Sequence, residues 1–238
     1  VQRYTKASSQ TLAKGLADAG VALFNGRGVC AGEHEVRVVA ADGGEQALSA
    51  QYIVLAGGSR SASFPGLTPD HDAVLDSTDL LNVPAVPESL IIVGAGAIGL
   101  EMADFFSAMG SAVTVVEAAP QLAPTEDTDI AQELQKLLGK AGRTCLAGIK
   151  ASSLLTRDGQ AVLTLEDGRE LTAAKALVAV GRKPNTDGLE AEKAGCALNR
   201  RGYVAVDDYL KAAPTVFAIG DINGKTLLAH AAEHQGVY

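Results

Sequence analysis

The chain has 238 residues, of which 47% are hydrophobic and 20% are charged. This composition suits a globular protein with one or two domains and a sizeable core. A formal net charge of −8 disfavours nucleic acid or an anionic membrane surface as a partner. No apolar run reaches the roughly 18 residues that span a bilayer, and the opening residues lack the apolar core of a signal peptide. We expect a cytoplasmic protein with no membrane partner.

Three cysteines, Cys30, Cys145 and Cys196, lie far apart in the sequence. An odd number without a short spacing indicates neither a disulfide framework nor a zinc site. We therefore expect three reduced thiols and no bound metal.

The first third of the chain mixes helical and strand patterns. Residues 5–19 have the apolar spacing of a helix, which Gly20 would end. Residues 21–24 are expected to form a short strand, and residues 35–40 and 47–56 a β-hairpin. Residues 63–89 contain four of the eight prolines and little periodicity, so a linker is expected there.

Beyond this linker, continuous apolar strands alternate with amphipathic helices. The expected strands are residues 90–93, 112–117, 176–180 and 216–219, the helices are 97–110 and 127–141, and residues 161–172 form a hairpin. Continuous apolar strands of this kind are buried in parallel sheets. The pattern predicts an α/β fold built on a Rossmann-like parallel sheet.

A glycine loop joins the first of these strands to the first helix. It reads Gly94-Ala95-Gly96-Ala97-Ile98-Gly99. The first glycine permits a tight turn, the second lets the backbone approach a pyrophosphate, and the third lets the helix pack closely on the strand. The amides and the dipole of the helix N-terminus then favour the phosphates. The loop predicts a dinucleotide site.

Glu117 stands at the end of the next strand, 18 residues after Gly99. A carboxylate there can accept hydrogen bonds from both hydroxyls of the adenosine ribose and repels a 2′-phosphate, so NAD is expected in preference to NADP. The alternative is a glycine-rich turn with an incidental surface glutamate.

Three further segments carry a family resemblance: TVFAIGD at 215–221, AVGRKPNT at 179–186 and LLAHAAEHQG at 227–236. They resemble, in this order, motifs of the pyridine nucleotide-disulfide oxidoreductase family, and the L-A-H form is most like its dihydrolipoamide dehydrogenase members. The resemblance implies an NAD-binding domain at 87–184, inserted into an FAD-binding domain formed by 1–86 and 185–238. Where the family usually has A-T-G, this chain has Ala56-Gly57-Gly58, which removes one hydroxyl.

The resemblance also implies the cofactor-binding residues. For NAD these are Gly94, Ala95, Gly96, Ala97, Ile98, Gly99, Glu101, Glu117, Ala151 and Gly181. For FAD they are Gly28, Gly57, Gly58, Ser59, Asp221, Leu227, Leu228, Ala229 and His230. His230 is expected to position the flavin and not to transfer protons. His34, His71 and His234 have no carboxylate at a catalytic spacing and are expected at the solvated surface. Residues 125–129, TEDTD, are expected to cap the following helix through Thr125 or Asp127.

The implied activity is oxidation of a dihydrolipoyl group on a partner protein, through FAD and an enzyme disulfide, to give NADH. The family's redox cysteine pair, its first G-x-G-x-x-G strand and its dimerisation domain with a His-Glu pair are not in this sequence. We therefore expect a fragment of a homodimeric enzyme, inactive alone and without catalytic residues of its own. The alternatives are a related NADH-dependent flavin reductase or oxidase, and a non-catalytic NAD-binding module.

Overall fold

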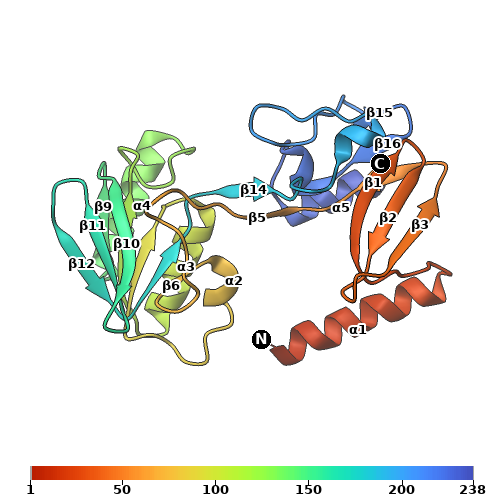
Figure 1. The fold of residues 1–238 in the computed structure, drawn as a ribbon. Coiled ribbons are helices and arrows are strands. Elements are labelled where there is room, and N and C mark those ends of the chain that lie inside the picture. The colour runs from red at the N-terminus through yellow and green to blue at the C-terminus, as the bar shows by residue number, and fades with distance from the viewer. Residues whose placement is uncertain (1, 238) are drawn as a thin grey trace. The chain divides into compact units, whose positions relative to one another are not determined.

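The computed structural model describes residues 2–237, which form two compact units (Figure 1). Unit 1 is Ser61–Gly181, and unit 2 consists of residues 3–60 and 182–237. The chain of unit 1 is thus inserted into that of unit 2. The unit boundary lies after Arg60 and not at the expected 86/87, because part of the proposed linker forms a strand of unit 1.

Unit 1 is built on a five-stranded sheet in the order β6-β13-β7-β8-β9, in which every neighbouring pair is parallel. The strands are β6 (Val74–Leu75), β7 (Ser89–Val93), β8 (Ala112–Glu117), β9 (Thr144–Ala147) and β13 (Lys175–Val178). The helices are α2 (Ser77–Leu80), α3 (Ala97–Ala108) and α4 (Thr128–Lys140). The sheet and its helices confirm the predicted Rossmann-like α/β fold.

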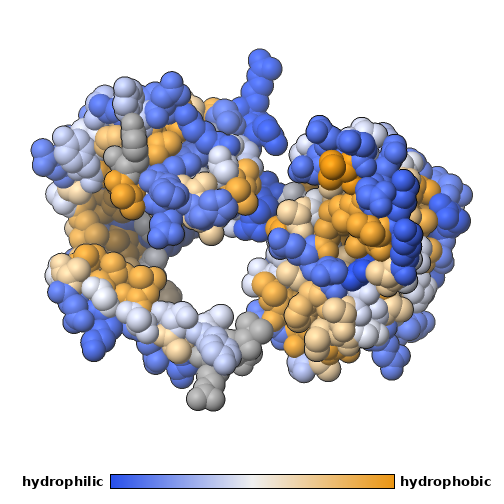
Figure 2. Space-filling view, turned by 180° about the vertical axis from the view of Figure 1, so that it is seen from behind, coloured by the Kyte–Doolittle hydropathy of each residue, from blue (hydrophilic) through white to orange (hydrophobic). Residues whose placement is uncertain are grey.

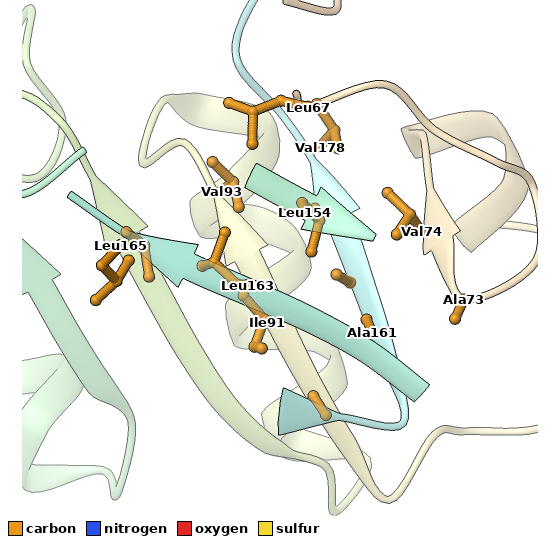
Figure 3. Close-up of a cluster of buried hydrophobic side chains, with 13 residues drawn as sticks. Leu67, Ala73, Val74, Ile91, Val93, Leu154, Ala161, Leu163, Leu165 and Val178 are labelled. Carbon is orange, nitrogen blue, oxygen red and sulfur yellow. The ribbon is translucent and has the colours of Figure 1, made fainter. Parts of the chain in front are cut away.

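The two faces of this sheet bury separate apolar clusters. On one face, side chains of α3 and α4 such as Phe106 and Leu138 pack with Ile92. The other face is covered by an antiparallel sheet of β10 (Ala151–Arg157), β11 (Gln160–Leu165) and β12 (Glu170–Ala173). Figure 3 shows Leu154 and Leu163 of this sheet lying over Ile91 and Val93. Because both faces are covered, the central strands are apolar at nearly every position.

Unit 2 contains two small sheets over one core. Its elements are α1 (Gln2–Asp18), β1 (Arg27–Gly32), β2 (Glu35–Val39), β3 (Glu45–Ser49), β4 (Ile53–Leu55), β15 (Lys211–Ala213), β16 (Val216–Ala218), the short helices η1 (Ala191–Ala194) and η2 (Gly220–Asn223), and α5 (Ala229–Val237). Strands β1, β2 and β3 form an antiparallel meander, and β4 pairs in parallel with β16. The remaining strands, β5 (Ser59–Ser61) and β14 (Arg182–Pro184), pair with each other.

Some local expectations differ from the structure. Residues 21–24 form no strand, and Val21, Leu23 and Phe24 are exposed, since no neighbouring strand supplies backbone partners for them. Asp127 is the N-cap of α4 as expected, but its side chain makes no capping hydrogen bond. Apolar residues also reach the surface of both units (Figure 2). Within residues 2–237, no helix has the length and hydropathy of a membrane span.

Candidate dinucleotide-binding site

The glycine loop of unit 1 begins where β7 ends. Gly94 has a φ of +106°, a region that L side chains rarely adopt. A Cβ at this position would lie 2.3 Å from the carbonyl oxygen of Ala179, at the end of the neighbouring strand β13. Both the turn and the packing therefore require glycine at position 94.

The other two glycines of the loop have different surroundings. A Cβ at Gly96 would meet nothing within 4 Å, so the backbone at Gly96 borders open space. A Cβ at Gly99 would lie 2.0 Å from the carbonyl oxygen of Gly94, so α3 packs directly against the loop. These are the surroundings that a pyrophosphate-binding loop needs, with a free approach at the second glycine and close packing at the third.

Strand register brings Glu117 to the same place. Val93 of β7 pairs with Val116 of β8, so the residues that follow them, Gly94 and Glu117, lie at the same edge of the sheet. The Glu117 carboxylate is half-buried. Oε2 accepts a hydrogen bond of 2.7 Å from the Ala95 amide, and Oε1 accepts one of 2.7 Å from the Ala119 amide. This carboxylate is held in a single position beside the loop.

A cleft of about 550 Å³ opens at this edge of the sheet. Its size falls within the range of small-molecule and cofactor sites. Its position beyond the carboxyl ends of parallel strands is where open α/β sheets bind ligands. The lining residues are Phe64, Pro65, Leu67, Val93, Gly94, Gly96, Val116, Glu117, Ala118, Pro124, Ile149, Lys150, Ala151, Ala179, Val180 and Gly181.

Half of the residues expected to bind NAD line this cleft. They are Gly94, Gly96, Glu117, Ala151 and Gly181. Ala95, within the loop, is fully buried. Ala97, Ile98 and Gly99 form the first turn of α3. Glu101 is exposed on the next turn of α3 and does not line the cleft. Its expected role in NAD binding stays a prediction.

Several residues of the cleft wall were not expected from the sequence. Phe64 and Pro65 belong to the stretch that was interpreted as a linker. Ala179 and Val180 follow β13 and begin the AVGRKPNT motif. That motif, and the rule that ligands bind beyond the carboxyl ends of parallel strands, are the signals that could have found them. Lys150 precedes β10, and its position in the cleft wall depends on tertiary pairing that no local pattern shows, since the Ile149 amide donates to the Glu117 carbonyl oxygen.

In unit 2, Ser59, Arg182 and Asp221 form a polar network. The Ser59 hydroxyl donates to Asp221 Oδ2 at 2.5 Å, and Arg182 Nε donates to Ser59 Oγ at 2.6 Å. Arg182 Nη2 also donates to the Ser59 carbonyl oxygen at 2.8 Å. The second Asp221 carboxylate oxygen is not engaged in this network, so Asp221 can accept a hydrogen bond from a hydroxyl of a ligand.

The other residues expected to bind FAD are spread over unit 2. Gly28 and Gly57 line a cavity of about 260 Å³ at β1 and the end of β4. Gly58 has a φ of +66°, as a turn after β4 requires. The segment of Leu227, Leu228, Ala229 and His230 is exposed and lines none of the cavities described above. Gly57 stands where the family usually has threonine. The space around it is tight, because a Cβ there would lie 3.2 Å from Ile222 Cδ1.

Comparison with known proteins identifies the family of the chain. The family model described as pyridine nucleotide-disulphide oxidoreductase matches residues 3–236. The chain belongs to this family. Dihydrolipoyl dehydrogenase 3 of Pseudomonas putida is 39% identical over 219 residues, which are 90% of this chain and 47% of that protein. Dihydrolipoyl dehydrogenase 1, mitochondrial, of Arabidopsis thaliana is 38% identical over 223 residues, or 91% of this chain and 44% of that protein.

Solved structures of family members have the same fold. LpdA from Mycobacterium tuberculosis superposes with a TM-score of 0.91 at 31% identity, over 98% of this chain and 52% of that one. The HOCl-induced flavoprotein disulfide reductase RclA from Escherichia coli gives a TM-score of 0.87 at 30% identity, over 98% and 54%. The chain thus spans about half the length of the relatives it matches. FAD and NAD are the cofactors of the dihydrolipoyl dehydrogenases in this family.

Proposed function

We propose that this chain forms the NAD- and FAD-binding framework of a disulfide oxidoreductase of the dihydrolipoamide dehydrogenase type. The observation that carries the proposal is the arrangement of Gly94, Gly96 and Glu117 at one edge of the parallel sheet, around a cleft of about 550 Å³. The Ser59–Asp221 pair in unit 2 supports the flavin part, because its free carboxylate oxygen suits a ribitol hydroxyl.

The residues of each unit suggest a distinct role. The amides at the start of α3 would hold the NAD pyrophosphate, and Glu117 would accept hydrogen bonds from the adenosine ribose. Ala151 and Gly181 lie elsewhere in the same cleft and would contact the two ring systems. In unit 2, Asp221 would hold the flavin side chain. The cofactors supply the hydride chemistry, and the protein supplies orientation.

In the proposed overall reaction, two thiols of a protein-bound dihydrolipoyl group become a disulfide, and NAD becomes NADH with release of a proton. The thiol steps need a redox cysteine pair and a base. The three cysteines of this sequence do not form such a pair, so this chain alone would bind NAD without catalysing the reaction. The lipoyl-bearing partner and a homodimeric assembly belong to the same proposal.

Fluorescence titration with NADH and NADPH tests the proposal. We expect NADH to bind more tightly, because a 2′-phosphate would approach the Glu117 carboxylate as a like charge. NADPH binding equal to or tighter than NADH binding would overturn the assignment. The Glu117→Ala variant should bind NADH about 1–3 kcal/mol more weakly, which is the cost of leaving hydrogen-bonding groups without a charged acceptor.

A further inference from the structure

Both oxygens of the Glu117 carboxylate are bound by the protein backbone. Its two oxygens accept hydrogen bonds from two different backbone segments, the Ala95 amide in the glycine loop and the Ala119 amide after β8. Both distances are 2.7 Å. Hydrogen bonds to a charged acceptor are among the stronger ones in proteins. A residue that served the ribose alone would not need these two contacts.

The Ala95 amide depends on the Glu117 carboxylate as its hydrogen-bond acceptor. Ala95 is fully buried, so an unpaired N–H there would lose its hydrogen bond to water without gaining another. The rest of the loop is fixed on both sides. The Gly94 amide donates to the Val116 carbonyl oxygen at 2.8 Å, and the Ala95 carbonyl oxygen accepts from the Ala123 amide at 2.9 Å. Among these hydrogen bonds of Gly94 and Ala95, only the one from the Ala95 amide to Glu117 involves a side chain.

The amides that follow Ala95 are in a different state. Gly96 is the N-cap of α3, and the first amides of a helix have no acceptor within the helix. Gly96 also borders open space in the cleft. The loop is therefore divided between an amide that Glu117 occupies, at Ala95, and amides left for a ligand, from Gly96 onward.

We propose that Glu117 orders the glycine loop before the dinucleotide arrives, and so positions the amides that bind the pyrophosphate. This role rests on the proposed function and is additional to accepting the ribose hydroxyls. Glu117 is then a positioning residue for one end of the cofactor and a contact residue for the other.

The double role has a consequence for cofactor choice. To admit a 2′-phosphate, Glu117 would have to move away, and both the Ala95 and the Ala119 amides would lose their acceptor. NADP is thus excluded by loop order as well as by charge repulsion. Removal of the carboxylate should weaken binding of both NADH and NADPH, and should not convert the site to NADPH.

Amide hydrogen exchange in the ligand-free protein tests the ordering role without any cofactor. In Glu117→Ala, we expect the Ala95 and Ala119 amides to exchange about ten-fold faster or more than in the unmodified protein, while the Ile91 amide in β7 is unchanged. Glu117→Gln keeps the size of the side chain but only one acceptor oxygen, so it should speed exchange at Ala95 or at Ala119, and it serves if the alanine variant does not fold. Glu88→Ala, which removes an exposed carboxylate next to β7, is the control. Unchanged exchange at Ala95 in Glu117→Ala, or at both Ala95 and Ala119 in Glu117→Gln, would overturn the proposal.

A binding cycle separates the two roles. NADH is compared with an analogue whose adenosine lacks the 2′ and 3′ hydroxyls. If Glu117 orders the loop, Glu117→Ala should still weaken the analogue about ten-fold. A loss of less than about two-fold would show that Glu117 serves the ribose alone. Failure of the unmodified chain to bind NADH would instead count against the proposed function, and the exchange result would stand independently.

Discussion

Gly99 lies so close to Gly94 that a Cβ on Gly99 would be 2.0 Å from the Gly94 carbonyl oxygen. The obstacle is backbone that is itself fixed, since the Gly94 amide is bonded to the Val116 carbonyl oxygen. The contact sets the distance between α3 and β7 and keeps the N-terminus of the helix at the edge of the cleft. Gly96, two residues after Gly94, has no such neighbour. The two glycines should therefore respond differently to substitution.

Gly99→Ala should destabilise unit 1. The added methyl group must displace backbone, and overpacking of this kind costs about 1–3 kcal/mol of unfolding free energy or more. Chemical denaturation measures the change. Gly139→Ala in α4 is the matched control, because Gly139 is exposed and a Cβ there meets nothing within 4 Å. Alanine at position 139 should be neutral or stabilising, since it favours a helix. Equal stability of Gly99→Ala and the unmodified chain would contradict the close packing.

Gly96→Val should abolish NADH binding with little change in stability. The valine side chain would enter the space that the pyrophosphate needs, whereas the folded protein has room for it. NADH titration and thermal unfolding are measured together, with Gly139→Val as the control for a glycine-to-valine change outside the cleft. If Gly96→Val bound NADH normally, the glycine loop would be only a turn.

The sequence was sufficient to predict those elements whose pattern lies within the element itself or its neighbours in the chain. The apolar runs at 90–93 and 112–117 are strands because both faces of the sheet are covered, and the spacing of the glycines marks the loop between β7 and α3. Strand β6 was missed, because two residues, Val74 and Leu75, carry too short a pattern. Its position depends on parallel pairing with β13, about 100 residues later in the chain.

The residues that line the cleft could also be predicted only in part. The loop and Glu117 could be found by spacing, because β7, α3 and β8 follow one another in the chain. The wall formed by Phe64 and Pro65 could not, since its residues join the site through the fold of a proline-rich stretch. His71 lies at the surface, as expected, but no local pattern of the sequence marks its carboxylate partner, Asp79. The His71 Nδ1 lies 2.7 Å from Asp79 Oδ2.

The His71–Asp79 pair predicts a pH dependence of stability. The hydrogen bond to Asp79 raises the pKa of His71 above its usual value, with smaller contributions from Asp76 and Asp70. A raised pKa in the folded state means that the pair stabilises the protein fully below the unfolded pKa of about 6.5, and that this contribution is lost as pH rises through the folded pKa.

The comparison is between the unmodified chain and His71→Asn. Asparagine tolerates the φ of +63° at this position but carries no charge. We expect the unmodified chain to have the higher unfolding temperature at about pH 5.5, with the difference vanishing by about pH 9. A difference that does not change with pH would show that the pair is not charged in the folded protein.

The two buried cysteines, Cys30 and Cys196, should be unreactive in the folded chain. Burial, with a further contribution from Cys30, raises the pKa of Cys196 to about 11, and burial also raises the pKa of Cys30 and Cys145. The thiolate is the reactive form, so little of it is present at about pH 8. Iodoacetamide should leave Cys30 and Cys196 unmodified in the native protein and modify all three cysteines after unfolding, as measured by mass spectrometry. Rapid native labelling of Cys196 would contradict this.

The isolated chain should not retain FAD. In unit 2, Ser59 and Asp221 suit the ribitol end of the flavin, and Gly28 and Gly57 line a small cavity. The pyrophosphate is the charged part of the cofactor, and a glycine loop at a helix N-terminus is the usual way to hold it. The sequence contains a single G-x-G-x-x-G, and it belongs to unit 1. Purified protein with a flavin absorbance band near one FAD per chain, or NADH–lipoamide turnover without added protein, would refute this expectation.

Unit 2 should also make the chain self-associate. Strand β4 forms an edge of the three-stranded sheet β15-β16-β4, and Val54 in this strand is 56% exposed. Tyr52 and Phe217 form an aromatic pair nearby, with ring centroids 6.3 Å apart, and Phe217 and Val54 line a further open cavity of about 350 Å³. An apolar strand edge pairs readily with another chain. Sedimentation velocity at increasing concentration should therefore show oligomers, and Val54→Lys should reduce them because a charged residue at an edge opposes strand pairing. A chain that remains monomeric across the concentration series would show that this edge is protected.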